Sequence, residues 1–140
     1  MAKTLRLRVL TPEKIVFDGD VDAITAMGEE GDFGVLAGHQ PLISKLGLGV
    51  LHCKRQGANK DVAVMGGVLT TDGETITVLS PAAELGDDID LVRAEEAKKR
   101  AEAQLASERS VTSDIKSEIA LRRAITRIKA KTGRIIGNQK

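Results

Sequence analysis

The sequence has almost no aromatic side chains: its 140 residues include two Phe and neither Trp nor Tyr. A surface that binds single-stranded nucleic acid by stacking bases on aromatic rings is therefore not expected. The core must be filled by Val, Leu, Ile and Ala instead. The formal net charge is only +1, so the chain as a whole has no field that would attract nucleic acid or anionic lipid. Neither is expected as a direct partner.

Cysteine and histidine are equally scarce. Cys53 is the only cysteine, which excludes an internal disulfide, and the two histidines, His39 and His52, are too few to make a structural zinc site expected. No apolar run approaches the roughly 20 residues of a membrane-spanning helix, and the first residues form a strand pattern rather than a signal-peptide core. We therefore expect a soluble protein in a reducing, intracellular compartment.

Glycine and proline are missing from most of the second half of the chain. All three prolines and 12 of the 14 glycines lie in residues 1–86, and none occurs between Gly86 and Gly133. The net charge is −3 for residues 1–86, with 8 basic and 11 acidic side chains, and +4 for residues 87–140, with 13 and 9. This division predicts two domains, 1–86 and 87–140.

The first half has the pattern of short strands joined by turns. Leu5, Leu7 and Val9 alternate with two arginines, which predicts a strand with one apolar face. Turn signals recur about every 8–12 residues, which is typical of a β-sandwich or barrel. Asp72-Gly73 predicts a tight hairpin, because a type I′ turn needs positive φ at both central residues. Further strand-like runs are residues 21–27, 42–46, 50–54, 61–65, 68–71 and 74–79.

The segment of residues 28–39 (GEEGDFGVLAGH) combines four glycines with three acidic side chains. We predict a surface loop that presents its acidic residues to a partner. A nest of backbone N–H groups that binds phosphate is the alternative, which the acidic residues disfavour. His39, at the end of this segment, is expected to make a structural hydrogen bond in a turn.

The second half has the composition of two helices. Residues 90–107 are rich in good helix formers, and Asp87 and Asp88 stand at the start, where the helix dipole favours negative charge. After a polar break at residues 107–113, a second helix is expected at about residues 114–131. An antiparallel hairpin would bury one narrow stripe from each helix, Ala94, Ala97, Ala101 and Leu105 with Ser117, Leu121, Ala124 and Ile128. Such an alanine-rich seam buries little apolar area, so the helices are expected to separate easily.

No motif or side-chain constellation of an enzyme is present. The phosphate-binding Gly-x-x-x-x-Gly-Lys-Ser/Thr loop, the Gly-x-Ser-x-Gly elbow and the His-Glu-x-x-His zinc motif are all missing. Cys53 and His52 are neighbours in a predicted strand, so their side chains point to opposite faces and cannot act as nucleophile and base. Cys53 is expected to be a buried or edge thiol, and the chain is predicted not to be an enzyme.

The arginines of the second half give the sharpest binding signal. Two pairs lie on common helix faces, at spacings of seven and four residues: Arg93 with Arg100, and Arg123 with Arg127. In a hairpin the four guanidiniums can converge near the carboxylates of Glu84 and Asp90. Guanidiniums bind phosphate oxygens bidentately, and carboxylates accept hydrogen bonds from adenine or ribose. From the spacing alone, a solvated basic face is the favoured interpretation, and a small nucleotide site is the alternative.

Residues 30–42 (EGDFGVLAGHQPL), 66–68 (GGV), 77–79 (TVL) and 89–94 (IDLVRA) are similar to a known family. They resemble the epsilon subunit of the bacterial F-type ATP synthase, and the resemblance covers nearly the whole chain. It implies an α+β protein, with an N-terminal antiparallel β-sandwich (1–86) followed by a C-terminal antiparallel two-helix hairpin (87–140). It also implies a non-catalytic subunit that requires no cofactor.

The resemblance implies partners as well. In the family, the sandwich binds the gamma subunit and rests on the membrane ring of c subunits, where the acidic glycine-rich segment meets the ring. Glu30, Asp32 and His39 are therefore expected to be contacts. Membrane association only through the complex, at the cytoplasmic face of the bacterial plasma membrane, is expected; a plastid thylakoid is the alternative.

The family's hairpin acts as a switch. Folded down, it permits ATP hydrolysis, and extended toward the catalytic alpha/beta head, it blocks hydrolysis. Some bacterial members bind one ATP as a regulatory ligand. The positions that match this site are Glu84, Ile89, Asp90, Arg93, Ala94, Arg100, Arg123 and Arg127. A stand-alone ATP-binding sensor and a simple β-sandwich adaptor remain as alternative functions.

Overall fold

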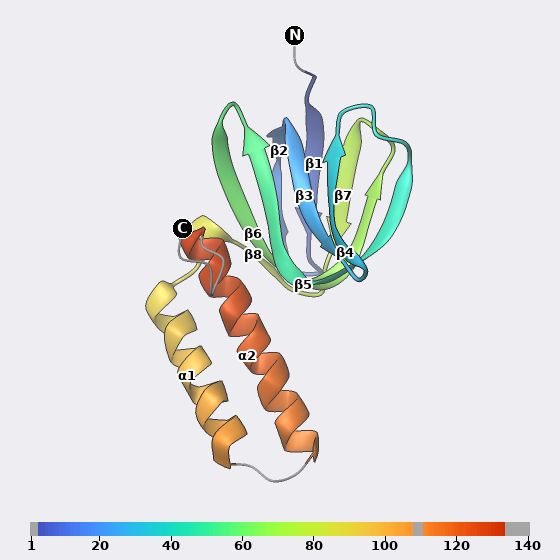
Figure 1. Ribbon diagram of the computed structural model, residues 1–140. Coiled ribbons are helices and arrows are strands. Elements are labelled where there is room, and N and C mark those ends of the chain that lie inside the picture. Colours follow the sequence, from blue (N-terminus) through green and yellow to red (C-terminus); the bar gives the residue numbers. More distant parts are fainter. Residues whose placement is uncertain (1–2, 108–110, 134–140) are drawn as a thin grey trace.

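The computed structural model describes residues 3–107 and 111–133, with side chains from residue 114 onward in the second range. A β-rich part comes first and a helical hairpin projects from one end of it (Figure 1). The strands are β1 (Leu5–Leu10), β2 (Ile15–Val21), β3 (Ala23–Gly28), β4 (Gly31–Leu36), β5 (Leu42–Arg55), β6 (Ala58–Thr71), β7 (Thr75–Leu79) and β8 (Ala83–Leu85). The 3-10 turn η1 (Gly86–Asp88) leads into helices α1 (Leu91–Ser107) and α2 (Val111–Thr132).

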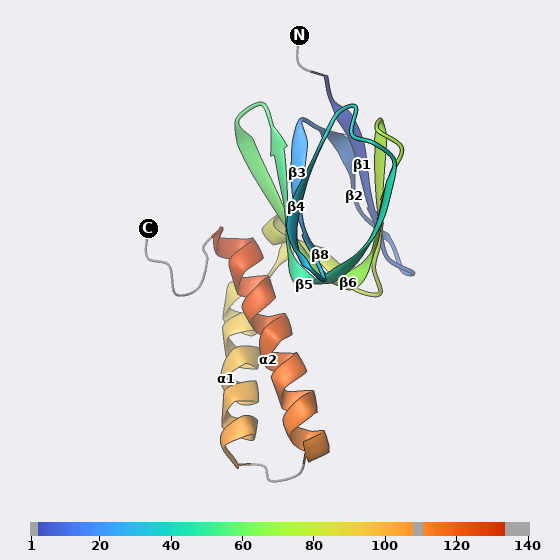
Figure 2. The same ribbon diagram turned by 45° about the vertical axis from the view of Figure 1, so that its right-hand side comes forward.

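The strands form one hydrogen-bonded sheet in the order β2-β1-β7-β6-β5-β3-β4, with β8 paired to β6. The two 14-residue strands β5 and β6 bend, so that the sheet folds over and encloses a core (Figure 2). Every strand pair is antiparallel except β1 with β7, which is parallel. The predicted fold class, a β-sandwich followed by a helical hairpin, is confirmed, and the β1–β7 pair is the exception to its antiparallel order.

The core is aliphatic, as the composition predicts. The two aromatic side chains, Phe17 and Phe33, are only partly buried and pack on its margin. The fully buried side chains of the interior include Leu5, Leu7, Val9, Val35, Val62, Leu69, Ile76 and Val78. A second cluster lies on the outer face of β5 and β6 and joins the sandwich to the hairpin: Val50, Ala63, Met65, Ile89, Ala94 and Ala130.

The number and extent of the strands differ from the prediction. The runs 42–46 and 50–54 are parts of the single strand β5, and the runs 61–65 and 68–71 are parts of β6. The edge strand β2 was not predicted, because acidic residues and a glycine interrupt its apolar pattern. The predicted loop at residues 28–39 is wrong in its middle, where Gly31–Leu36 form β4 at the other edge of the sheet.

The type I′ turn lies in a different hairpin from the predicted one. Gly73 has a φ of 98° but Asp72 has no positive φ. The Asp72 carboxylate instead accepts hydrogen bonds from the N–H groups of Glu74 and Thr75, at 2.9 and 2.8 Å, which is an Asx-type turn. The positive φ angles at both central residues occur at Gln56 (51°) and Gly57 (79°), between β5 and β6.

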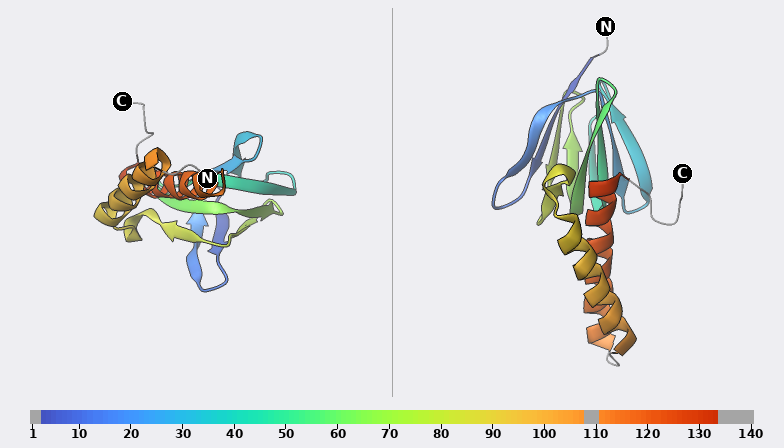
Figure 3. Two further views of the ribbon diagram at one scale, coloured as in Figure 1. Left: turned by 90° about the horizontal axis from the view of Figure 1, so that it is seen from below. Right: turned by 90° about the vertical axis from the view of Figure 1, so that its left-hand side faces the viewer.

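The two helices lie side by side and antiparallel (Figures 1 and 3). Helix α2 begins at Val111, before the predicted start near residue 114, and residues 108–110 of the predicted polar break lie outside the described residues. The hairpin docks on the sandwich through α2, which packs on β5, β6 and η1. The seam is narrow, as predicted, and its fully buried members are small: Ala94, Ala101, Ser117 and Ala124.

Candidate functional site at the base of the hairpin

The start of α1 is fixed by Asp90. Its Oδ1 accepts a hydrogen bond from the backbone N–H of Arg93 at 3.1 Å, and its carbonyl oxygen accepts one from the N–H of Ala94 at 3.0 Å. This is the geometry of an N-terminal helix cap. Asp90 therefore has a structural role in addition to the ligand contact that the sequence predicts for it. The cap also places Arg93 in the first turn of α1.

A depression of about 370 Å³ opens where the last strand, η1 and both helices meet. Seven of the eight residues predicted from the sequence line it, contributed by β8, the link that follows η1, α1 and α2. Its lining is Glu84, Asp88, Ile89, Asp90, Arg93, Ala94, Ala97, Arg100 and Arg127. The helix-face argument thus brought together residues that are up to 43 positions apart in the chain.

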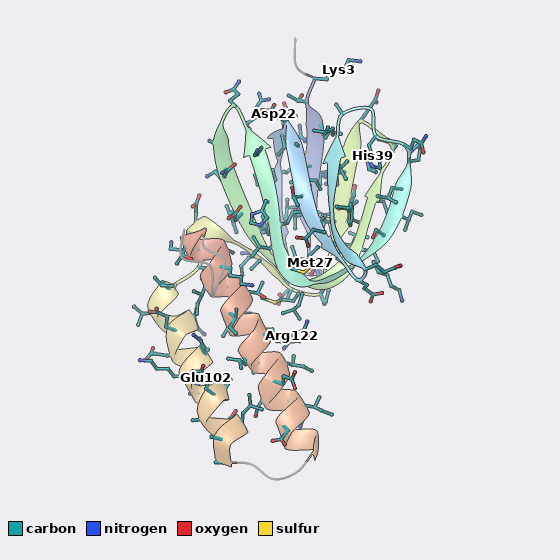
Figure 4. All side chains as sticks on the ribbon, in the orientation of Figure 1. Lys3, Asp22, Met27, His39, Glu102 and Arg122 are labelled. Carbon is teal, nitrogen blue, oxygen red and sulfur yellow. The ribbon has the colours of Figure 1, made fainter. Side chains whose placement is uncertain are left out.

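The eighth predicted residue, Arg123, lies farther along the hairpin. It lines an adjoining depression of about 270 Å³, to which Ala97, Arg100 and Arg127 also contribute. The two depressions share these three residues, so all eight predicted positions border one continuous surface. Figure 4 shows the side chains of the two helices along this hairpin.

Sequence reasoning missed two polar residues of this surface. Asp88 lines the first depression and Gln104 lines the second. Gln104 lies four residues after Arg100, so helical spacing was the signal that would have found it. Asp88 was noticed only as a charge at the helix start.

The surface carries four arginines and the three carboxylates of Glu84, Asp88 and Asp90. Arg127 Nε donates a hydrogen bond to Glu84 Oε1 at 2.5 Å, and this ion pair ties α2 to β8. Among the described side chains, no acidic group forms an ion pair with Arg93, Arg100 or Arg123. Guanidiniums that border one surface and form no ion pair with a carboxylate are suited to binding an anion with several oxygens, such as a phosphate chain.

The residues predicted to contact the c-ring do not form one patch. Glu30 lies in the turn between β3 and β4, and Asp32 follows it on β4, opposite Met27. His39 comes after the far end of β4, as the labels of Met27 and His39 in Figure 4 show. The two groups are thus separated by the length of β4, about 20 Å. The His39 Nδ1 hydrogen bond to the Gln40 carbonyl oxygen, 2.7 Å, fits the structural role expected for this residue.

His52 and Cys53 point to opposite faces of β5, as predicted. His52 Nδ1 lies 2.9 Å from Oδ1 of Asp61, its cross-strand neighbour on β6. Cys53 is 2% exposed and packs in the core. Burial raises the pKa of the Cys53 thiol to about 12, so its reactive thiolate form is suppressed. The prediction of a buried or edge thiol is confirmed, and the thiol is buried.

Comparison with known proteins decides the family. The β-sandwich domain of the ATP synthase delta/epsilon chain matches residues 4–86. The long α-helix domain of the same chain matches residues 87–132. The chain belongs to the ATP synthase delta/epsilon family. This confirms the resemblance found in the sequence.

Individual relatives of the family match over nearly their full length. The ATP synthase epsilon chain of Desulforamulus reducens is 45% identical over 130 residues, covering 93% of this chain and 98% of that one. That of Syntrophobacter fumaroxidans is 40% identical over 129 residues, with coverages of 92% and 96%. That of Bacillus velezensis is 39% identical over 127 residues, with coverages of 90% and 96%. Such chains are non-catalytic subunits, which confirms that the protein is not an enzyme.

Solved structures of ATP synthases contain chains of the same fold. A chain in the cryo-EM structure of the Euglena gracilis mitochondrial ATP synthase, comprising OSCP, F1 and c-ring, matches with a TM-score of 0.73 and 25% identity. The match covers 85% of this chain and 76% of that one. A chain in the central stalk and c-ring structure of the Tetrahymena thermophila enzyme matches in fold, with a TM-score of 0.60, 14% identity and coverages of 93% and 98%. Neither described helix is long and apolar enough to cross a membrane.

Proposed function

We propose that the protein is a rotor subunit of an F-type ATP synthase, in which the sandwich couples the gamma subunit to the c-ring and the hairpin controls ATP hydrolysis. The observation that carries this proposal is the family match across both the sandwich and the helices. The solved structures with this fold contain a c-ring, and one is of a central stalk. In this role the chain lies at the cytoplasmic face of the bacterial plasma membrane, attached only through its partners.

The outer face of the sandwich offers a surface for gamma. Ile15, Leu10, Leu79 and Val68 are successive neighbours across β2, β1, β7 and β6, and so form one apolar row. Ile15 is 56% exposed and Leu79 is 52% exposed, and nearby Ile43 is 77% exposed. A contiguous exposed apolar row is typical of a protein-binding surface. We assign this row to gamma, and the acidic β3–β4 turn to the polar loops of the c-ring.

The hairpin is suited to movement because its seam buries little apolar area and it docks on the sandwich mainly through one of its helices. Its buried seam consists of alanines and a serine, and it contacts the sandwich through α2. Alanine side chains bury much less apolar area than leucine side chains. Because burial contributes about 25 cal/mol per Å² of apolar surface, this seam contributes little stability. In the extended position, the basic hairpin would meet the alpha/beta head and inhibit hydrolysis. Only a few kcal/mol of differential binding is needed to move such an equilibrium from one state to the other.

We further propose that ATP is the regulatory ligand of the docked hairpin. Its phosphates would lie against the guanidiniums of Arg100 and Arg123, and its base and ribose would lie near Glu84 and Asp90. The first depression, about 370 Å³, has the size of a small-ligand site. ATP held there would touch both helices and β8 at once, so it would stabilise the docked state by mass action. ATP is not required for the fold in this proposal.

Calorimetric titration of ATP into the full chain tests the site. Arg100→Ala and Arg123→Ala should each weaken binding by about 10- to 100-fold, because a charge-assisted hydrogen bond contributes about 1.5–3 kcal/mol. Arg122→Ala is the matched control, because Arg122 is exposed on α2 and lines neither depression. Unchanged affinity in both test variants would contradict the site, and absence of binding to the unmodified chain would contradict the ligand.

Asp90 needs its own pair of variants, since it also caps α1. Asp90→Ala removes both the cap and the carboxylate, whereas Asp90→Ser keeps a capping oxygen and removes the charge. If the carboxylate binds ATP, both variants lose affinity while only the alanine variant loses helix content by circular dichroism. Full affinity in the serine variant would leave Asp90 with its structural role alone.

The rotor role is tested in the assembled complex. Removal of residues 88–140 should leave a complex that contains gamma and the c-ring and hydrolyses ATP faster than the complete one. Failure of the shortened chain to assemble would contradict the division of roles between sandwich and hairpin. A full chain that never co-purifies with gamma would favour the stand-alone sensor.

A further inference from the structure

A buried glycine lies where the hairpin meets the sandwich. Gly86 begins η1, and a Cβ atom added to it would fall well inside van der Waals contact of the Ala130 carbonyl oxygen. The same Cβ would lie 3.0 Å from the Ala130 carbonyl carbon and 3.0 Å from the Asp61 carbonyl oxygen. These are backbone atoms of α2 and β6, so no side-chain rotation can relieve the contact. Any side chain at position 86 conflicts with the docked position of α2.

The backbone conformation of Gly86 does not require glycine. Its φ lies outside the left-handed region, in contrast to Gly67, which has a φ of 129°, and Gly73. An L-residue would therefore fit the backbone conformation at position 86. The closest contact of an added Cβ, with the Ala130 carbonyl oxygen, arises from the approach of α2, whereas the 3.0 Å contact with the Asp61 carbonyl oxygen of β6 is present in either state. A substitution here therefore strains the docked state more than the undocked state.

Polar contacts hold the same turn of α2 in place. Lys131 Nζ donates a hydrogen bond to the carbonyl oxygen of Asp87 at 3.3 Å. The Asp87 carboxylate in turn accepts one from Lys60 Nζ of β6 at 2.7 Å. Ala130 itself is 5% exposed and belongs to the apolar cluster between α2 and the sheet. The last turn of α2 thus sits on η1 through packing and hydrogen bonds together.

This contact lies one helical turn from the proposed nucleotide site. Arg127 precedes Ala130 by three residues, and Glu84 precedes Gly86 by two. The seating of α2 on Gly86 therefore sets whether Arg127 reaches Glu84 and whether the two helices close the depression. A shift on the order of 1 Å at this point would misplace the arginine side chains, and misplacements of that size are costly in preorganised sites.

We propose that Gly86 is the positioning residue of the site: its missing side chain lets the last turn of α2 seat on η1, and this seating completes the depression between hairpin and sandwich. The inference rests on the proposed nucleotide function, but the docking of the hairpin can be measured without nucleotide. Gly86 does not contact the ligand and acts through the placement of α2.

The test compares Gly86→Ala with Gly47→Ala in the full chain. Gly47 is a matched control because its φ is also outside the left-handed region and a Cβ there meets nothing within 4 Å. Spin labels on Asn59→Cys and Glu118→Cys, both exposed positions, report the distance between β6 and α2. Native Cys53 is buried and does not take up label. Calorimetry with ATP gives the second measurement.

In the unmodified chain and in Gly47→Ala, we expect one narrow distance distribution. Gly86→Ala should add a broad, displaced population to the distance distribution. It should also lower ATP affinity by about tenfold or more, because the free-energy cost of overpacking a buried contact corresponds to a factor of this size. The β-sheet signal and thermal transition of the sandwich should not change. Lys131→Ala, which loosens the same contact without adding an atom, should give a smaller displaced population.

An unchanged distance distribution in Gly86→Ala would overturn the proposal. Loss of the sandwich transition would also overturn it, because the strain would then fall on the sheet instead of the hairpin. If the unmodified chain binds no ATP, the nucleotide function fails, and the distance measurement still decides the role of Gly86. A displaced hairpin with full ATP affinity would show that seating and binding are independent, and would overturn the positioning role.

Discussion

The sandwich and the hairpin are stabilised in opposite ways. The sandwich buries leucine, isoleucine and valine side chains completely, and among them Leu7, Leu69 and Ile76 are 0% exposed. The hairpin seam buries alanine and serine, and its outer surfaces carry the charges. Because the free energy per unit of buried apolar area is similar in both regions, the larger side chains buried in the sandwich stabilise it far more than the seam stabilises the hairpin. A small protein can in this way keep one part rigid for assembly and another part free for control.

The two regions also differ in charge, and the candidate site lies where they meet. Residues 1–86 carry a net charge of −3 and residues 87–140 one of +4. The Glu84–Arg127 ion pair spans this boundary. Both side chains are partly exposed, so the pair by itself adds little stability. The remaining arginines stay available for a ligand. A small anion bound at this boundary would therefore have a large effect on the docking of the hairpin.

The difference in stability between the sandwich and the hairpin is tested most strongly by a substitution in the sandwich core. Ile76→Ala should lower the free energy of unfolding by about 2–5 kcal/mol, because it removes a fully buried side chain and leaves a cavity. Urea denaturation followed by circular dichroism measures this loss. Leu79→Ala on the same strand is the control, since Leu79 is 52% exposed. Equal losses in the two variants would show that the described core does not carry the stability.

A core change in the hairpin should have a smaller and local effect. Ala101 is 2% exposed in the helix seam, so Ala101→Leu should force the helices apart at a cost of about 1–3 kcal/mol. The sandwich transition should be unaffected, while ATP affinity falls. Ala103→Leu, at an exposed position of the same helix, should leave both unchanged. If Ala101→Leu destabilised the sandwich as much as Ile76→Ala does, the two regions would be one cooperative unit.

The smallest predicted effect is a pH dependence of docking. A hydrogen bond from Lys60 lowers the pKa of Asp87 below its ordinary value, which is about 4. The docking-dependent part of this lowering comes from the positive charge of Lys131 on α2, so its contribution is fully present above about pH 4 and is lost as the pH falls through the lowered pKa of the docked state. Both groups are solvent-exposed, so the change should be slight. The label distance between β6 and α2, followed from pH 6 down to pH 3, measures it.

Asp87→Asn is the control for this effect. It removes the titrating carboxylate, so the docking of the variant should not change with pH over the same range. An equal pH dependence in the variant and in the unmodified chain would assign the effect to another group.

Helical features were predictable from the sequence because helix faces follow from spacing alone. The position of Arg93 and Arg100 on one face, and of Ala101 in the seam, needed only the 100° step of a helix; their approach to Arg127 followed from the expected hairpin. The strands were less predictable. Gly66-Gly67 has the pattern of a turn, yet it lies inside β6, where Gly67 passes close to the backbone of Leu79.

The remaining errors have similar local causes. Gly49 interrupts the apolar pattern of β5, but it is needed because a Cβ there would collide with the Met27 side chain across the sheet. The β4 strand was missed since glycine and acid dominate its sequence. Such tertiary reasons for glycine leave no trace in a local pattern, and the same holds for Gly86.

The long strands β5 and β6 have a mechanical consequence. Their outer face carries the Val50, Ala63 and Met65 cluster that holds α2. Farther along the same two strands lie Ile43 and Val68, at the surface assigned to gamma. The paired strands therefore link the base of the hairpin to the partner surface without a loop between them, with their pairing interrupted at Gly47 and Gly66. In the proposed rotor, torque applied at one end would be transmitted along these strands to the other end, so the turning subunit would carry the hairpin's anchor with it while the hairpin itself remained free to move.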